Sequence, residues 1–187
     1  MSVSTLPFAF INAAAFFIGS VSAECSPEYP NGTEEKLNWF LCDPDKPGVL
    51  TTSSLRLLDR DGQENYPIDL SKGLMVEVNG ENQSGDTFET ILMDVELRYW
   101  GSILWFSCSW HRLPHLGFLS NLDGCELAKN CPVQPGVTKF RQPFDFGILG
   151  RVLRGLGSNT VYEVTLRAKD GSNREELSCI KLQALLL

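Results

Sequence analysis

Apolar and polar residues alternate with a period of two through much of this chain, and this pattern constrains the fold most. The clearest run places Tyr162, Val164, Leu166 and Ala168 on one side and polar or charged residues on the other. Successive side chains of a β-strand point to opposite faces, so such a run predicts a strand with one buried and one solvated face. Further predicted strands cover residues 50–58, 74–79, 91–98, 103–110, 137–141 and 177–186.

Turn-forming residue pairs separate these runs. They are Asp61-Gly62, Asn79-Gly80, Ser84-Gly85, Asp123-Gly124, Pro135-Gly136 and Asp170-Gly171. No long helical pattern, internal repeat or linker interrupts the series. Seven or eight short strands therefore predict an all-β, immunoglobulin-like antiparallel β-sandwich.

The first 23 residues carry no charged side chain. Their apolar core runs from Phe8 to Ile18, and Val21-Ser22-Ala23 follows with the small residues that a signal peptidase requires. The core is shorter than the roughly 20 residues of a membrane-spanning helix, which favours cleavage over a retained anchor. We therefore expect a signal peptide over residues 1–23 and a single domain over residues 24–187.

The composition of the remaining chain indicates an oxidising compartment, either extracellular or the lysosomal lumen. Its six cysteines form an even set, which predicts three disulfides but leaves fifteen pairings open: Cys25, Cys42, Cys108, Cys125, Cys131 and Cys179. Cys125 and Cys131, bounded by glycine and proline, predict a short closed loop. Sequons at Asn31 and Asn82 predict glycosylation on exposed loops. A net charge of −7 argues against a nucleic-acid partner.

Enzyme motifs are weak in this sequence. It contains no G-x-S-x-G nucleophile elbow. His111 and His115 have the spacing of two metal ligands on a helix, but Pro114 between them argues against a helix, and both are expected on the surface. A Ser-His-Asp hydrolase remains formally open. We predict no enzyme activity, no catalytic or metal site and no cofactor.

Residues 142–157 break the alternation. Four glycines make a continuous helix unfavourable there, while the segment carries Phe144, Phe146, Leu149 and Leu153. These apolar residues must meet the core, a ligand or a membrane surface. Arg151 and Arg154 in the same segment could meet lipid headgroups, so we predict a rim that touches membranes transiently.

The order of several motifs resembles the ML lipid-recognition family, which includes lumenal sterol carriers and ganglioside activators. The motifs are Phe40-x-Cys42, Leu104-Trp105 with Cys108, Asp123-Gly124-Cys125 to Cys131-Pro132, Phe140, the run from Tyr162 to Ala168, and Cys179-Ile180-Lys181. The resemblance covers residues 37–187. It implies the disulfides Cys42–Cys179 and Cys125–Cys131. In the family, a cysteine close in sequence closes the third bridge. That cysteine is missing here, so by elimination Cys25 is expected to form a disulfide with Cys108.

The same resemblance implies an apolar cavity between the sheets and noncovalent binding and transfer of a lipid such as a sterol, fatty acid or glycolipid. The residues that it would bring to the ligand are Val76, Val78, Val95, Leu97, Phe144, Phe146, Leu149, Leu153, Tyr162, Val164 and Leu166. Two alternatives remain open. The chain could be a lipid-loaded co-receptor or activator subunit with a protein partner, or a plain immunoglobulin-like interaction module.

Overall fold

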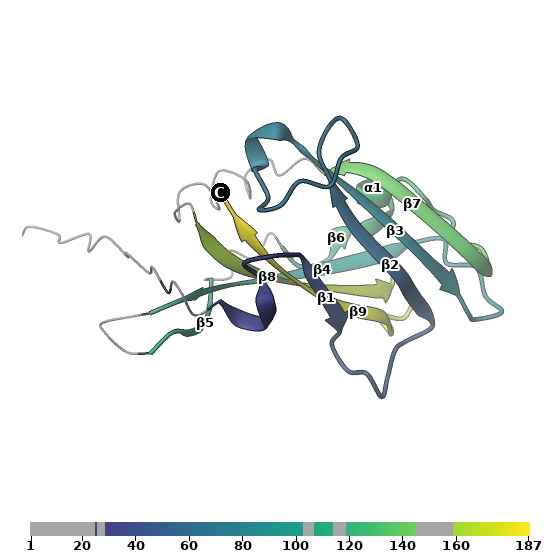
Figure 1. The fold of residues 1–187 in the computed structure, drawn as a ribbon. Coiled ribbons are helices and arrows are strands. Elements are labelled where there is room, and N and C mark those ends of the chain that lie inside the picture. The colour runs from purple at the N-terminus through teal and green to yellow at the C-terminus, as the bar shows by residue number, and fades with distance from the viewer. Residues whose placement is uncertain (1–24, 26–28, 103–106, 114–118, 145–158) are drawn as a thin grey trace, which may run out of the picture.

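The computed structural model describes residue 25 and residues 29–102, 107–113, 119–144 and 159–187 (Figure 1). The larger sheet has the order β1-β9-β8-β4-β5, and β6 also pairs with β4. Its strands are β1 (Asn38–Leu41), β4 (Ile91–Gly101), β5 (Ser109–Arg112), β6 (Leu122–Asp123), β8 (Thr160–Asp170) and β9 (Glu176–Leu186). The smaller sheet, β2-β3-β7, consists of β2 (Leu50–Leu58), β3 (Leu74–Asn82) and β7 (Gly136–Phe144).

All named strand pairs are antiparallel, and apolar residues from both sheets pack together. These findings confirm the predicted antiparallel sandwich. The described ranges hold nine strands instead of seven or eight, because β1 and β6 are too short to show alternation in the sequence. The helices are short: η1 (Pro30–Gly32), η2 (Leu70–Lys72) and α1 (Gly124–Ala128). Within those ranges, no helix has the length and apolar character needed to cross a membrane.

Three apolar clusters pack the described core. The central cluster joins the sheets, because Leu55 of β2 packs with Ile180 and Leu182 of β9. One end cluster contains Ile68, Leu70, Tyr162, Ala184 and Leu186, and the other contains Phe88, Ile91, Val133, Ala168 and Leu177. The position of these clusters defines which face of each strand is the inner one.

The outer face of β8 differs from the prediction. Alternation predicts that Glu163 and Thr165 face solvent, yet each is 4% exposed. An N-terminal segment lies against this part of the sheet: the Asn31 side chain donates a hydrogen bond of 2.7 Å to Gln183, and Gln183 donates one of 2.7 Å to Glu163. Thus the first half of β8, through Thr165, is largely buried on both faces.

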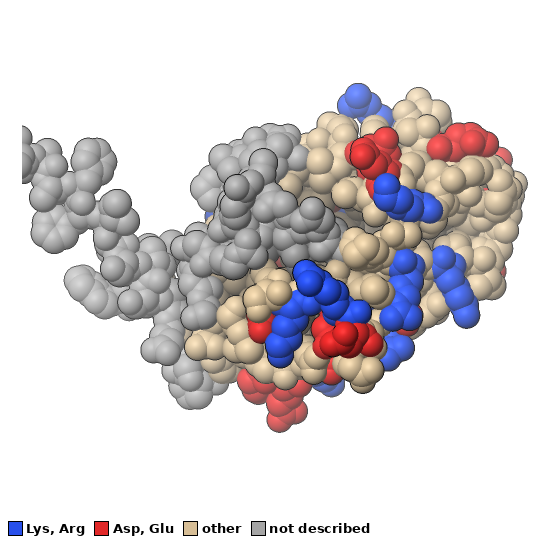
Figure 2. Space-filling view, turned by 90° about the horizontal axis from the view of Figure 1, so that it is seen from above, with Lys and Arg blue, Asp and Glu red and all other residues tan. Residues whose placement is uncertain are grey.

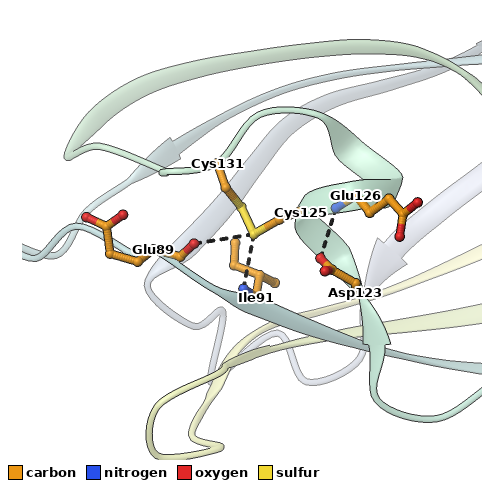
Figure 3. The surroundings of a disulfide bond; sticks show 6 residues. All are labelled: Glu89, Ile91, Asp123, Cys125, Glu126 and Cys131. Atoms are coloured by element: carbon orange, nitrogen blue, oxygen red, sulfur yellow. Dashed lines mark hydrogen bonds between the residues drawn. A yellow bond between two sulfur atoms is a disulfide. The ribbon is translucent and has the colours of Figure 1, made fainter.

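Three disulfides hold the fold: Cys25–Cys108, Cys42–Cys179 and Cys125–Cys131. The second and third pairings are those that the family resemblance implies, and the first is the pairing that elimination leaves. Figure 3 shows the shortest loop, where the backbone N–H of Ile91 donates to Cys125 Sγ at 3.3 Å and the same sulfur lies 3.6 Å from the Glu89 carbonyl oxygen. Asp123 caps α1 by accepting from the N–H of Glu126 at 2.9 Å. The disulfide loop is thereby fixed to the start of β4.

Asn82 contradicts the expectation that both sequons lie on exposed loops. Asn82 is only 2% exposed. Its amide nitrogen donates to the carbonyl oxygens of Asp86 at 2.9 Å and Val133 at 3.3 Å, and its oxygen accepts from the Ser84 N–H at 3.0 Å. A glycan on that nitrogen would remove one donor and has no route to solvent. Asn31, by contrast, is exposed.

We therefore predict one N-glycan per chain, at Asn31. The folded protein secreted from eukaryotic cells should lose the mass of a single glycan on treatment with peptide N-glycosidase F. Asn31→Gln should abolish this shift. Peptide mapping that finds a glycan on Asn82 of correctly folded protein would contradict the buried arrangement.

Candidate functional site

The predicted lining residues of β4 and β8 form one continuous apolar patch. Val95 pairs with Leu166, and Leu97 pairs with Val164, in the antiparallel register of these strands. Directly opposed residues share one face of a sheet and contact each other. Val76 and Val78 lie two residues apart on β3, so they share one face of the smaller sheet.

Three of the predicted residues belong to the described core clusters or pack against them. Val78 and Leu166 pack against the central cluster around Leu55. Tyr162 belongs to the end cluster with Ile68 and Leu70. The burial of these three side chains is therefore explained by the core itself, although the prediction that they contact ligand remains untested.

The other four predicted residues differ. Val76, Val95, Leu97 and Val164 belong to none of the three clusters of the described residues. Val95 is nevertheless 7% exposed and Leu97 5%, so both are withdrawn from water. We call these four residues the inner patch. A guest at the inner patch would have to displace the protein atoms that cover Val95 and Leu97 in this structure.

No charged residue occupies the central inner positions of the described strands. These positions are 55 and 57 on β2, 74–80 (even) on β3, 93–99 (odd) on β4, 138–142 (even) on β7, 162–168 (even) on β8 and 178–184 (even) on β9. Figure 2 shows Lys and Arg beside Asp and Glu on one face of the molecule. Arg98 and Arg112, for example, each lie 2.9 Å from the Glu96 carboxylate.

Two tyrosines bring polar groups to the inner face. Tyr99 is paired with Tyr162 across the sheet, and the Tyr99 ring lies 5.3 Å from the ring of His111. His111, predicted to lie in a surface loop, is a half-buried residue of β5 whose Nε2 lies 3.1 Å from the Gly101 carbonyl oxygen. Sequence reasoning missed Tyr99, although it falls in phase with Val95 and Leu97.

Tyr162 is 2% exposed, and burial, with a smaller contribution from Tyr99, raises its pKa to about 12. A raised pKa in the folded state contributes stability that is complete below the ordinary pKa of about 10 and is lost as the pH rises through about 12. Burial also raises the pKa of Tyr66. We expect an ultraviolet titration at 295 nm to show Tyr162 ionising last, and Tyr162→Phe should remove that last step. A tyrosine complement that titrates entirely near pH 10 would show that Tyr162 is solvated.

The predicted rim is only partly described. Phe144 is the last residue of β7 and is paired in register with Leu74 at the start of β3. Phe146, Leu149, Arg151, Leu153 and Arg154 lie outside the described residues. Their assignment to a membrane-touching rim therefore remains a prediction.

No protein-family model matches this chain, and no curated protein sequence matches it. Two solved structures align with most of its length. A Niemann-Pick type C2 protein from Japanese carpenter ant is 13% identical, with 79% of this chain and 97% of the ant protein covered and a TM-score of 0.43. Chicken MD-1, complexed with lipid IVa, is 13% identical, with 80% and 88% covered and a TM-score of 0.38. Both similarities are distant, so a function has to be derived from the residues of this chain.

Proposed function

We propose that this protein binds a lipid noncovalently between its two sheets and transfers it between membranes. The inner patch is the observation that carries this proposal: four apolar side chains face the interior, outside the packed clusters, on sheets whose described inner positions carry no charge. The resemblance to the ML family supports the same function. The disulfides support a secreted or lysosomal lumenal location.

The energetics suit a carrier. Transfer of one methylene group from water to an apolar interior contributes about 0.8 kcal/mol, so a chain of ~16 carbons would gain on the order of 12 kcal/mol. Most of that gain disappears when the lipid comes from a bilayer, where its tail is already in hydrocarbon. A protein of this kind can therefore load a lipid at one membrane and release it at another.

Organic extraction followed by mass spectrometry tests lipid binding directly. We expect lipid to be extracted from the purified wild-type protein. Val76→Phe combined with Val164→Phe should fill the inner patch and reduce the extracted amount several-fold. The matched control is Val137→Phe, because Val137 is 80% exposed on the outer face of β7. Wild-type protein that neither carries nor takes up lipid would contradict the proposal and favour a plain interaction module.

The membrane-touching rim makes a separate prediction. Leu149→Asp combined with Leu153→Asp should preserve folding but slow lipid transfer between vesicles about tenfold or more, because two carboxylates oppose insertion into the bilayer interface. A fluorescence transfer assay between donor and acceptor vesicles measures the rate. Leu127→Asp with Val137→Asp is the control, since these exposed residues lie elsewhere. Equal rates for both double variants would place membrane contact outside the 142–157 segment.

A further inference from the structure

Gln142 lies on the inner face of β7. Along this strand Val137, Lys139, Arg141 and Pro143 are exposed, whereas Thr138, Phe140 and Gln142 are half-buried. The exposed phase is the outer one, because the Arg141 guanidinium lies 3.8 Å from the carboxylate of Glu77 on β3. The opposite phase faces inward: Phe140 is paired with Val78, which packs against the central cluster.

The Gln142 amide stands next to the inner patch. Its register partner on β3 is Val76, and the next pair on the same face is Leu74 with Phe144, where the pairing of β3 with β7 ends. Gln142 therefore lies near the end of the strand from which the proposed rim continues. A lipid lying along the inner patch would reach this amide with the part of the molecule closest to the rim.

The hydrogen-bonding groups of Gln142 are uncommitted among the residues described. The two buried amides elsewhere are used by the protein: Asn82 donates to two carbonyl oxygens, and Gln183 both accepts from Asn31 and donates to Glu163. The side chain of Gln142 forms no such bond within the described ranges and is half-buried. A primary amide offers two donor hydrogens and one acceptor oxygen to a partner.

The described inner positions offer no counter-charge to a charged partner. An ion transferred into an apolar environment is strongly disfavoured unless an opposite charge meets it. The inner positions described above hold no lysine, arginine, aspartate or glutamate. Next to Val76, an uncharged hydroxyl, ester or amide group can pair with Gln142 at lower cost than a carboxylate.

We infer that Gln142 binds the uncharged, hydrogen-bonding group of an amphiphilic lipid and makes the site prefer such lipids to free fatty acids. This inference rests on the proposed lipid binding and specifies the orientation of the guest. The polar group lies at Gln142, near the rim, and the hydrocarbon extends along Val76, Val95, Leu97 and Val164.

Three probes of equal chain length test it: 1-dodecanol, dodecanoate and dodecane. Each is titrated against delipidated protein that holds a fluorescent apolar reporter, at pH 7.5, and its affinity is measured by displacement. Dodecanol should bind wild type more tightly than dodecanoate. In Gln142→Leu the ratio of the dodecanol affinity to the dodecane affinity should fall about threefold to tenfold, the range expected for loss of one hydrogen bond. Thr138→Val, which removes a hydroxyl from the same face of β7, is the matched control and should preserve that ratio.

The outcomes separate this inference from the function on which it rests. Failure of the reporter and of all three probes to bind would overturn lipid binding itself. If the probes bind but the ratio of the dodecanol affinity to the dodecane affinity is the same in wild type and Gln142→Leu, only the role of Gln142 would be overturned. Stronger binding of dodecanoate than of dodecanol would overturn the preference for an uncharged group.

Discussion

Replacement of Cys42 and Cys179 by serine should lower the free energy of unfolding by about 4–5 kcal/mol. This disulfide joins residues 137 apart in the sequence, and a cross-link that closes a longer loop removes more entropy from the unfolded chain. It also fixes the chain just after β1 to β9, where the Cys42 N–H donates to the Cys179 carbonyl oxygen at 3.0 Å. Denaturant unfolding of the double variant measures the loss.

The matched control is the Cys125→Ser and Cys131→Ser double variant. Its loop spans a sequence separation of only 6, so the same entropy model expects a loss of about 2 kcal/mol. The difference between the two double variants removes the effect of introducing serine. Equal losses would show that local packing around the sulfur atoms, not loop length, determines the contribution of these disulfides.

Gln183→Leu should lower the free energy of unfolding by about 3 kcal/mol. The Glu163 side chain is 5% exposed, its Oε2 accepts from Gln183 at 2.7 Å, and its Oε1 has no hydrogen-bond partner among the described residues. The Nε of Arg98 lies 3.9 Å from Oε1. The substitution leaves a buried carboxylate without a donor, which is far more costly than the average loss of one hydrogen bond.

A double-mutant cycle separates this explanation from a simple packing defect. When Glu163→Leu is combined with Gln183→Leu, both polar groups leave together, and most of the lost stability should return. Gln63→Leu, at an exposed position, controls for the gain in apolar surface. Losses that add without recovery would show that the two side chains are energetically independent.

Much of the fold can be predicted from the sequence, because strand alternation and turn residues are local features of the chain. Strand alternation and turn residues specify where β2, β3, β4, β8 and β9 run, and the alternation of β4 and β8 also specifies their inner residues. The outer face of β8 could not be predicted, because Asn31 and Gln183, which cover or contact Glu163, are distant from it in sequence. Whether another segment covers the outer face of a strand depends on tertiary packing, which the period-two alternation of apolar residues does not encode.

The candidate site, too, can be predicted from the sequence only in part. Val95 and Leu97 follow directly from alternation, but their separation from the packed clusters depends on how the two sheets meet. Along β7 the apolar residues occur in both phases, since Val137 faces outward and Phe140 inward. The sequence therefore could not reveal that Gln142 shares the inner face. Asn82 was misjudged because a sequon specifies an acceptor and says nothing about its burial.

The double burial of β8 has a consequence for how the protein would accommodate guests. With β4 and β9 on its two sides and little solvent at Val161, Tyr162, Glu163 or Thr165, this strand should show the slowest amide hydrogen exchange in the domain. A strand so protected should move little when a guest binds. The sandwich would then adjust to lipids of different width through movement of β3 and β7. The amides of these two strands should exchange faster than those of β8, and their protection should change most when a ligand binds.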